Sequence, residues 1–259
     1  MYLAMSIAAS GLRNQQLRID TVSHNVANAN SHGFKNARLD FKDSLYKTNI
    51  TPGPARSPDE NQQKGHGVML TAITRDFKPG NLERTERELD FAIEGDGFFS
   101  LENPGGGLSY TRNGVFNLSV EAGGTFLVNG QGLYILDENG ARINIPAGTT
   151  SIQADVDGTL RFNSHDVVLG TARLGIFTFR NLKGLELTGN ANYVPSPAAG
   201  ERIQANDTVT VRQGILEASN VNLAEDMTRL IRTQRAFQLA SRALTTADEM
   251  QGVANNMRR

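Results

Sequence analysis

The chain has 259 residues, a formal net charge of -1 and no cysteine. This balance argues against a nucleic-acid or anionic-membrane partner, for which a basic excess is expected. The lack of cysteine excludes disulfides, thiolate zinc sites and cysteine nucleophiles. With 39% hydrophobic and 20% charged residues, the composition predicts an ordinary globular protein with one large domain or two modest ones.

Residues 2–30 predict a long helix. They contain no proline, and one stripe of side chains recurs at alternating spacings of three and four, as in a helix that packs along another helix. The first ten residues lack a basic stretch ahead of an apolar block, so we expect no cleaved signal peptide. We expect Gly33 to end this region in a left-handed conformation. The stripe consists of Met5, Ala8, Leu12, Gln15, Ile19, Val22, Val26 and Ala29.

The middle of the chain predicts β structure. Residues 48–67 hold three prolines and read as an extended loop. Further on, turn pairs such as Asn129-Gly130 and Asn139-Gly140 separate short runs rich in β-branched and aromatic residues. This spacing favours an antiparallel sandwich or barrel-like domain over βαβ units. The runs that we expect to form strands include 115–120, 126–128, 133–136, 152–156 and 174–179.

A second long helix is predicted from about Asn222 to Met257. Its stripe again steps by threes and fours, but polar residues are interleaved with apolar ones. Polar residues at such positions make a seam weaker and more specific for register. This seam therefore suits a helix that meets several neighbours. The stripe consists of Leu223, Met227, Leu230, Gln234, Phe237, Ser241, Leu244, Asp248 and Gln251.

Two terminal helices of the same pattern around a β region imply that the chain ends meet in space. We expect an α+β fold in which a discontinuous helical coiled-coil domain, residues 1–32 with 220–259, carries an inserted antiparallel β domain at 76–219. Residues 33–75 are expected to form a connecting β/loop segment that contains the extended loop at 48–67.

One string resembles a catalytic motif. Residues 155–160, Asp-Val-Asp-Gly-Thr-Leu, are similar to the first motif of haloacid-dehalogenase phosphatases, whose first Asp is the nucleophile and whose Asp pair holds Mg²⁺. That family needs a buried parallel strand before the motif, whereas residues 151–154 alternate like a half-exposed antiparallel strand. We therefore expect a hairpin with Asp157-Gly158 in its turn.

No other chemistry is indicated. The four histidines are scattered, and nucleophile-elbow, P-loop and dinucleotide signatures are absent from the sequence. We predict no catalytic residue, metal, cofactor or small-molecule substrate. An adhesin or binding module is a further alternative, and it would keep its function without the terminal helices.

Four asparagines bracket the two helices: Asn25, Asn28, Asn220 and Asn222. Two interpretations are equally open from the residues alone. The asparagines could serve as caps and exposed amides, or they could form hydrogen bonds between packed helices that fix the register.

Several segments resemble, in order, the signatures of the flagellar rod and hook family of axial proteins. They are Asn-Val-Ala-Asn-Ala-Asn-Ser-His-Gly-Phe-Lys at 25–35, Leu-Asp-Phe-Ala-Ile-Glu-Gly-Asp-Gly-Phe-Phe at 89–99, Tyr-Thr-Arg-Asn-Gly-Val-Phe at 110–116, Gly-Ile-Leu-Glu-Ala-Ser-Asn-Val-Asn at 214–222 and Gln-Arg-Ala-Phe at 234–237. The resemblance covers essentially the whole chain. Length and layout are most similar to the distal-rod type, with a proximal-rod or hook-type member as the alternative.

The resemblance implies a non-enzymatic structural subunit that polymerises into a hollow drive shaft, which transmits torque and conducts exported subunits. The partners it implies are further copies of the chain, other axial rod and hook proteins, the flagellar type III export apparatus and the ring proteins around the rod. The location it implies is the rod of the flagellar basal body, in the periplasmic space, reached without a cleaved signal peptide. The loop at 48–67 is hypothesised to stiffen contacts between stacked subunits.

The expected self-assembly interface lies on both terminal helices and on the segments that bound them. It comprises Leu12, Ile19, Val22, Asn25, Val26, Asn28, Gly33, Phe34, Asn220, Asn222, Met227, Leu230, Gln234, Phe237 and Leu244.

Overall fold

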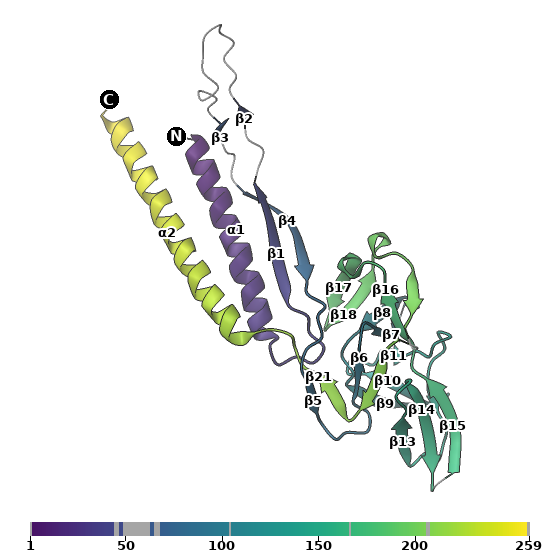
Figure 1. The fold of residues 1–259 in the computed structure, drawn as a ribbon. Helices are drawn as coiled ribbons and strands as arrows, with labels where there is room; N and C mark the ends of the chain where they lie inside the picture. Colours follow the sequence, from purple (N-terminus) through teal and green to yellow (C-terminus); the bar gives the residue numbers. More distant parts are fainter. Residues whose placement is uncertain are drawn as a thin grey trace. The chain divides into compact units, whose positions relative to one another are not determined.

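The computed structural model describes residues 2–43, 47–48, 63–64, 68–103, 105–165, 167–205 and 208–257. The chain forms two compact units (Figure 1). Unit 1 comprises Met1–Ala27, Ala37–Thr74 and Asn222–Arg259, and unit 2 comprises Asn28–Asn36 and Arg75–Val221. Each unit is thus assembled from segments far apart in the sequence. Most of the predicted loop at 48–67 lies outside the described residues.

Unit 1 is built on two long helices that pack against each other, α1 (Tyr2–Ala27) and α2 (Leu223–Asn256). The 34 residues of α2 give it a length of about 51 Å. Strand β1 (Ala37–Asp43) packs on α1 and pairs with β4 (Val68–Arg75). A second pair, β2 (Lys47–Thr48) with β3 (Gln63–Lys64), is antiparallel.

The start of α2 follows from its sequence. The side chain of Asn222 accepts a hydrogen bond from the backbone N–H of Glu225 at 3.3 Å, and its carbonyl accepts from the N–H of Asp226 at 2.9 Å. Asn222 is therefore the N-cap, and acidic residues fill the first turn, where they complement the helix dipole.

Unit 2 is mainly β. Its largest sheet has ten strands, seven of them in the order β12-β10-β11-β7-β8-β18-β17, with β9, β16 and β19 attached beside them; β13-β14-β15 form a second sheet, and β6 pairs with β20 and β5 with β21. The strands are β5 (Leu82–Arg84), β6 (Phe91–Glu94), β7 (Phe98–Glu102), β8 (Leu108–Thr111), β9 (Phe116–Glu121), β10 (Gly124–Asn129), β11 (Tyr134–Ile135), β12 (Asn144–Ile145), β13 (Ser151–Ala154), β14 (Thr159–Ser164), β15 (Val167–Arg173), β16 (Ile176–Phe179), β17 (Leu185–Gly189), β18 (Asn192–Pro195), β19 (Arg202–Gln204), β20 (Thr210–Gln213) and β21 (Ile215–Glu217). Two short 3-10 helices, η2 (Leu182–Gly184) and η3 (Pro197–Ala199), complete it.

Both hydrophobic clusters of the described chain lie in unit 2. One gathers around Phe91, Phe99 and Phe116, and the other around Phe98, Tyr110 and Tyr193. Edge-to-face ring contacts hold each cluster, for example Phe99 with Phe116 at 5.1 Å between ring centroids. Burial of large aromatic side chains therefore stabilises unit 2 by itself.

Unit 1 has no comparable core. Among its described residues, the buried apolar side chains are Val22 and Ala37, and the buried polar ones are Asn25, Asp226 and Thr233. Burying two apolar residues contributes little free energy compared with the conformational entropy that is lost when two long helices become ordered.

The predicted α+β fold is confirmed: helices from both ends of the chain pack together, and the region between them contains the antiparallel strands. The left-handed conformation predicted at Gly33 is also present, with φ at +69°. A Cβ there would lie 2.5 Å from the backbone nitrogen of Asn113. Glycine is therefore required at this position both by conformation and by space.

The phosphatase interpretation of residues 155–160 is wrong, and the hairpin interpretation is confirmed. Strands β13 and β14 pair antiparallel across the string, and Gly158 takes a positive φ of +83° in the turn. The carboxylate of Asp155, the nucleophile in that interpretation, instead accepts a hydrogen bond from Arg161 Nε at 2.7 Å.

No described helix has the length and hydropathy to cross a bilayer.

Candidate assembly site

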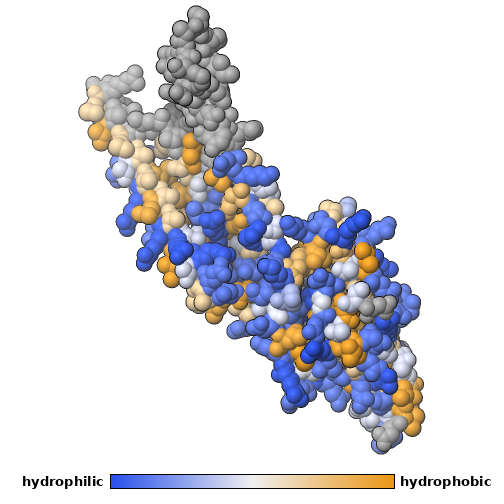
Figure 2. Space-filling model, in the orientation of Figure 1, coloured by the Kyte–Doolittle hydropathy of each residue, from blue (hydrophilic) through white to orange (hydrophobic). Residues whose placement is uncertain are grey.

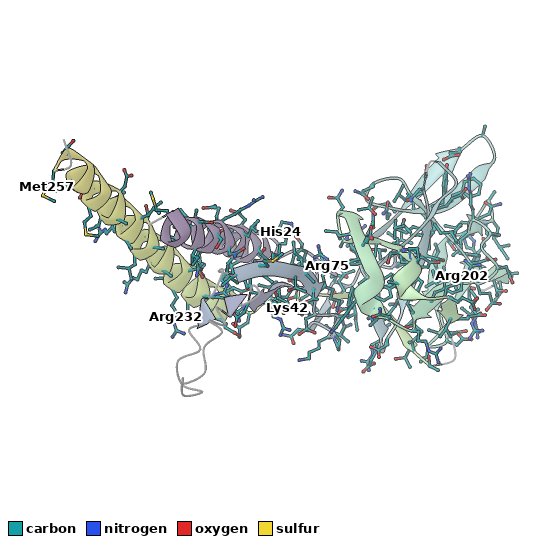
Figure 3. All side chains as sticks on the ribbon, turned by 90° about the horizontal axis from the view of Figure 1, so that it is seen from above. His24, Lys42, Arg75, Arg202, Arg232 and Met257 are labelled. Carbon is teal, nitrogen blue, oxygen red and sulfur yellow. The ribbon has the colours of Figure 1, made fainter. Side chains whose placement is uncertain are left out.

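The first part of the site is an apolar face on α2 that unit 1 leaves uncovered. Its side chains are between 43% and 79% exposed, and Figure 2 shows hydrophobic surface along this helix. In Figure 3, Arg232 and Met257 stand out from α2. We call this surface the open face of α2; it comprises Leu223, Met227, Ile231, Leu239, Met250, Val253 and Met257.

The opposite side of α2 packs in unit 1, and its most buried side chains are small or polar. Thr233 is buried and donates its hydroxyl hydrogen bond to the carbonyl of Arg229 at 2.7 Å. Ala236, Ala240 and Ala247 are half-buried on the same side. The larger apolar residues of α2 are therefore divided between the two sides, and several of the largest are on the open one.

The second part is a polar joint between α1, β1 and α2. The side-chain amide of Asn25 donates to the carbonyl of Ala37 at 2.9 Å, and its oxygen accepts from the N–H of Ala37 at 3.0 Å. Asn25 also hydrogen-bonds the carboxylate of Asp226. Burial raises the pKa of the Asp226 carboxyl above its ordinary value, although the nearby Arg229 opposes this. One side chain thus ties three elements of unit 1 together.

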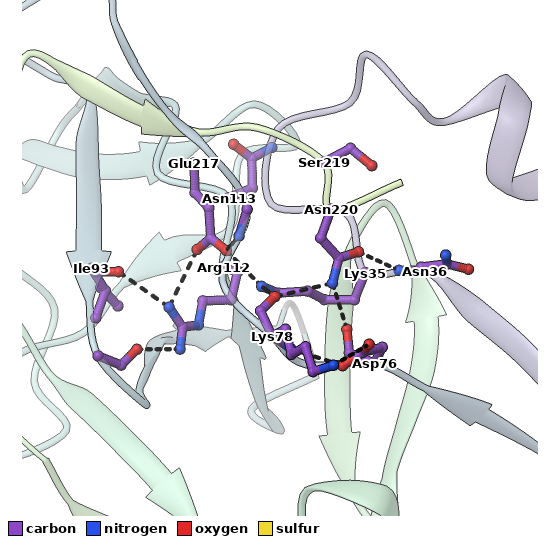
Figure 4. Close-up of polar contacts among 12 residues, drawn as sticks. Lys35, Asn36, Asp76, Lys78, Ile93, Arg112, Asn113, Glu217, Ser219 and Asn220 are labelled. Atoms are coloured by element: carbon purple, nitrogen blue, oxygen red, sulfur yellow. Dashed lines mark hydrogen bonds and ion pairs between the residues drawn. The ribbon is translucent and has the colours of Figure 1, made fainter. Parts of the chain in front are cut away.

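The third part is a buried ion cluster in unit 2, where the segment after α1 meets the segment before α2 (Figure 4). Glu217 accepts from Lys35 Nζ at 2.5 Å and from Arg112 Nη1 at 3.2 Å. It also accepts from the backbone N–H of Gly80 at 2.9 Å. All three ionic side chains are at most 2% exposed. Because the cluster holds two cations and one anion, Glu217 is the group on which both cations depend.

Backbone carbonyls complete this cluster. Lys35 Nζ donates to the carbonyl of Lys78 at 2.7 Å, and Arg112 Nη2 donates to the carbonyl of Gly95 at 2.6 Å. Desolvation on burial lowers the pKa of both Lys35 and Arg112, and the charge of Glu217 acts against that shift. The cluster therefore joins four parts of unit 2: the segment after α1, the stretch from Lys78 to Gly95, the residue that follows β8, and the end of β21.

Asn220 adds a second cross-link nearby. Its side-chain oxygen accepts from the N–H of Asn36 at 2.8 Å, and its amide donates to the carbonyls of Asp76 and Lys78 at 2.8 and 3.0 Å. Among the asparagines that bracket the helices, Asn25 and Asn220 thus bind backbone inside the subunit, and Asn222 caps α2. The side chain of Asn28 accepts from the hydroxyl of Ser31.

The remaining residues of the expected interface fall into three groups. On α1, Val22 is buried and Leu12, Ile19 and Val26 are half-buried. On α2, Leu230, Phe237 and Leu244 are half-buried, while Met227 and Gln234 are exposed. Gly33 and Phe34 are buried in unit 2. Met227 and Gln234 are therefore the residues of this group that are most accessible to another molecule.

The sequence analysis missed the meeting of Lys35, Arg112 and Glu217. Each residue lies inside one of the quoted motifs, but spacing along the chain does not show that the three motifs converge. A usable signal was present, because each charged residue stands in a segment of apolar or turn residues where a solvated charge is out of place. Over the parts of the chain that the structure describes, no group of three metal-ligating side chains is assembled.

Three family models match successive parts of this chain. The model for flagella basal body rod protein covers residues 5–35, that for the flagellar hook protein FlgE/F/G D1 domain covers 92–162, and that for the flagellar basal body rod FlgEFG protein C-terminal covers 212–257. The first and last contain most of α1 and α2, and the middle one lies in unit 2.

Full-length relatives agree. The flagellar basal-body rod protein FlgG of Buchnera aphidicola subsp. Acyrthosiphon pisum is 35% identical over 262 residues, covering 96% of this chain and 97% of the relative. FlgG of Bacillus subtilis is 35% identical over 260 residues, with the same coverage. The flagellar hook-basal body complex protein FlhP of Bacillus subtilis is 31% identical over 272 residues and covers both chains completely.

The two-unit fold, the open helix face and these matches define a structural protein of the bacterial flagellar axis. The chain belongs to the flagellar basal-body rod protein family. It is a structural rod subunit and not an enzyme, and it assembles with other axial flagellar proteins.

Proposed function

We propose that this subunit polymerises into the rod through unit 1, and that neighbouring copies cover the open face of α2. The observation that carries this proposal is the composition of that face. Its seven apolar side chains are more than 40% exposed, while the described part of unit 1 buries two apolar side chains. An exposed apolar surface of this kind marks a site of association.

The difference in apolar burial between the two units predicts the order in which they fold. Unit 2 contains two aromatic-rich clusters and a buried ion cluster, so it is expected to fold in the single chain. Unit 1 is expected to gain most of its stability when other copies bury the open face, because binding to the folded state stabilises it by mass action. The terminal helices then act as the assembling elements, and the division into helical and β parts serves that purpose.

The finer placement of the subunit also belongs to the proposal. We place it in the distal part of the rod, in the periplasmic space, because the relatives named FlgG match along nearly their whole length. Its partners are then further copies of itself, the adjoining rod and hook proteins, the ring proteins around the rod and the export apparatus that delivers it without signal-peptide cleavage. The rod so formed would be hollow and would transmit torque.

The open face is tested by Leu239→Asp. Leu239 is 66% exposed, so the substitution leaves the packing of α1 on α2 intact, unlike changes at the half-buried Phe237 or Leu244. The matched control is Val120→Asp, which places the same charge at an apolar residue of unit 2 that is 81% exposed. We expect Leu239→Asp to abolish polymers seen by electron microscopy and sedimentation, and Val120→Asp to keep them.

The near-ultraviolet circular dichroism of the unit 2 tyrosines serves as the folding check in both variants. Polymerisation of Leu239→Asp at the concentration that suffices for the native chain would refute the role of the open face.

A further inference from the structure

The exposed surface of α2 carries charges that are segregated along the helix. Arg232, Arg235 and Arg242 lie in its first two-thirds, and Asp248 and Glu249 lie near its end. We call these the basic block and the acidic block. All five are exposed, and among the described residues none of the five has a salt-bridge or hydrogen-bond partner for its side chain. By contrast, Arg229, on the half-buried side of α2, pairs with Glu225 and Asp226.

The two blocks are complementary in charge but cannot meet within one straight helix. Fourteen residues separate Arg235 from Glu249, which is about 21 Å along the axis. A side-by-side neighbour in the same orientation and register would place arginine beside arginine, which disfavours that arrangement. A neighbour displaced by two heptads instead brings Glu249 level with Arg235.

The apolar residues of the open face favour the same displacement. Leu239 and Val253 are also fourteen residues apart, and both are more than half exposed. A shift of two heptads therefore aligns an apolar pair and an opposite-charge pair at once. In coiled coils, apolar seams flanked by charges set partner choice and orientation in this way.

From this coincidence we propose that the acidic block of one copy docks on the basic block of the next, with the two α2 helices parallel and offset by two heptads. The occupant of the open face is thus a second copy of this chain. The inference rests on the proposed polymerisation and specifies its axial offset. Because the two blocks are different surfaces, the contact is heterologous and propagates as an open polymer, whereas an isologous contact would close as a dimer.

Charge exchange tests the docking. R232E/R235E makes both blocks acidic, and D248K/E249K makes both basic, so each variant alone should raise the critical concentration for polymerisation at least about tenfold, as expected for like charges brought together. The chain that carries all four substitutions restores complementarity and should polymerise as the native chain does. A mixture of the two double variants should also polymerise. R180E/K183E, on exposed residues of unit 2, is the matched control and should behave as the native chain.

The offset is tested separately with disulfides, since the chain has no cysteine of its own. Gln238 and Gly252 are exposed and fourteen residues apart, and a Cβ at Gly252 meets nothing within 4 Å. Oxidised polymers of Q238C/G252C should give a ladder of covalent multimers, while either single-cysteine variant should not.

The outcomes separate the two proposals. If the native chain polymerises but the double charge variants polymerise equally well, the docking of the blocks is refuted while the proposed function stands. If the fourfold exchange fails to restore polymers, or if cross-linking stops at dimers, the parallel two-heptad contact is refuted. If Leu239→Asp polymerises as the native chain does, the proposed function itself fails, whatever the charges do.

Discussion

Glu217 holds together two buried cations and a backbone amide of unit 2. It neutralises Lys35 and Arg112, all at most 2% exposed, and it also accepts from the backbone of Gly80. Removing one partner of a buried ion cluster costs far more than removing an exposed pair, because the remaining charge stays buried without compensation.

We therefore expect Glu217→Gln to lower the free energy of unfolding of unit 2 by about 3–5 kcal/mol, since two cations would share a neutral amide. Adding Lys35→Met should recover part of that loss, because one uncompensated cation is removed with it. Denaturant unfolding followed by tyrosine fluorescence measures both. The control is Glu102→Gln, which breaks the partly exposed pair with Arg142. An equal loss in Glu217→Gln and in the control would contradict this role.

Asp226 gives unit 1 a dependence on pH. Burial raises the pKa of its carboxyl, so between the unfolded value near 4 and the raised folded value the native state binds more protons than the unfolded state. The free energy of unfolding of unit 1 therefore falls as pH rises through that window. Asp226→Asn should flatten this dependence, as measured by thermal melts of the helical circular dichroism of the assembled polymer between pH 4 and 7. Asp20→Asn, an exposed change on α1, should keep it.

At the scale of elements, the two helices could be predicted because their cause is local. Both lack proline, both repeat at threes and fours, and the cap at Asn222 and the left-handed Gly33 mark where α2 begins and where the turn after α1 lies. The stripe predicted on α1, Met5 to Ala29, is half-buried or buried at every position. The hairpin at 155–158 was equally local, because Asp-Gly sets the turn and its flanking residues alternate.

The stripe predicted on α2 was less accurate. Met227, Gln234 and Asp248 are exposed, while Asp226, Thr233 and Ala240 lie on the buried side. The heptad pattern favoured the larger apolar residues, of which Leu230, Phe237 and Leu244 are half-buried, but the fully buried side chains of α2 are polar. Periodicity alone does not show which of two usable faces a neighbour within the chain will cover. The partners in the ion cluster were not predicted for a related reason. A charge in an apolar segment signals a buried partner but does not show which one, and the contact of Lys35 with Glu217 spans 182 positions in the sequence.

For the whole molecule, the contrast between the units has a functional consequence. Unit 2 carries both hydrophobic clusters of the described chain, whereas unit 1 leaves the open face of α2 exposed. We propose that such a subunit has a self-sufficient β unit and a helical unit that association completes, which suits a structural subunit of the rod.

The most direct test is hydrogen–deuterium exchange of the native chain, measured in dilute monomer and in the assembled polymer. We expect the amides of unit 2 to be protected equally in both states, and those of α2 from Ile231 onward to become protected only in the polymer. If α2 were protected in the dilute monomer to the same degree as in the polymer, the terminal helices would already be complete within one chain, and association would not be what stabilises them.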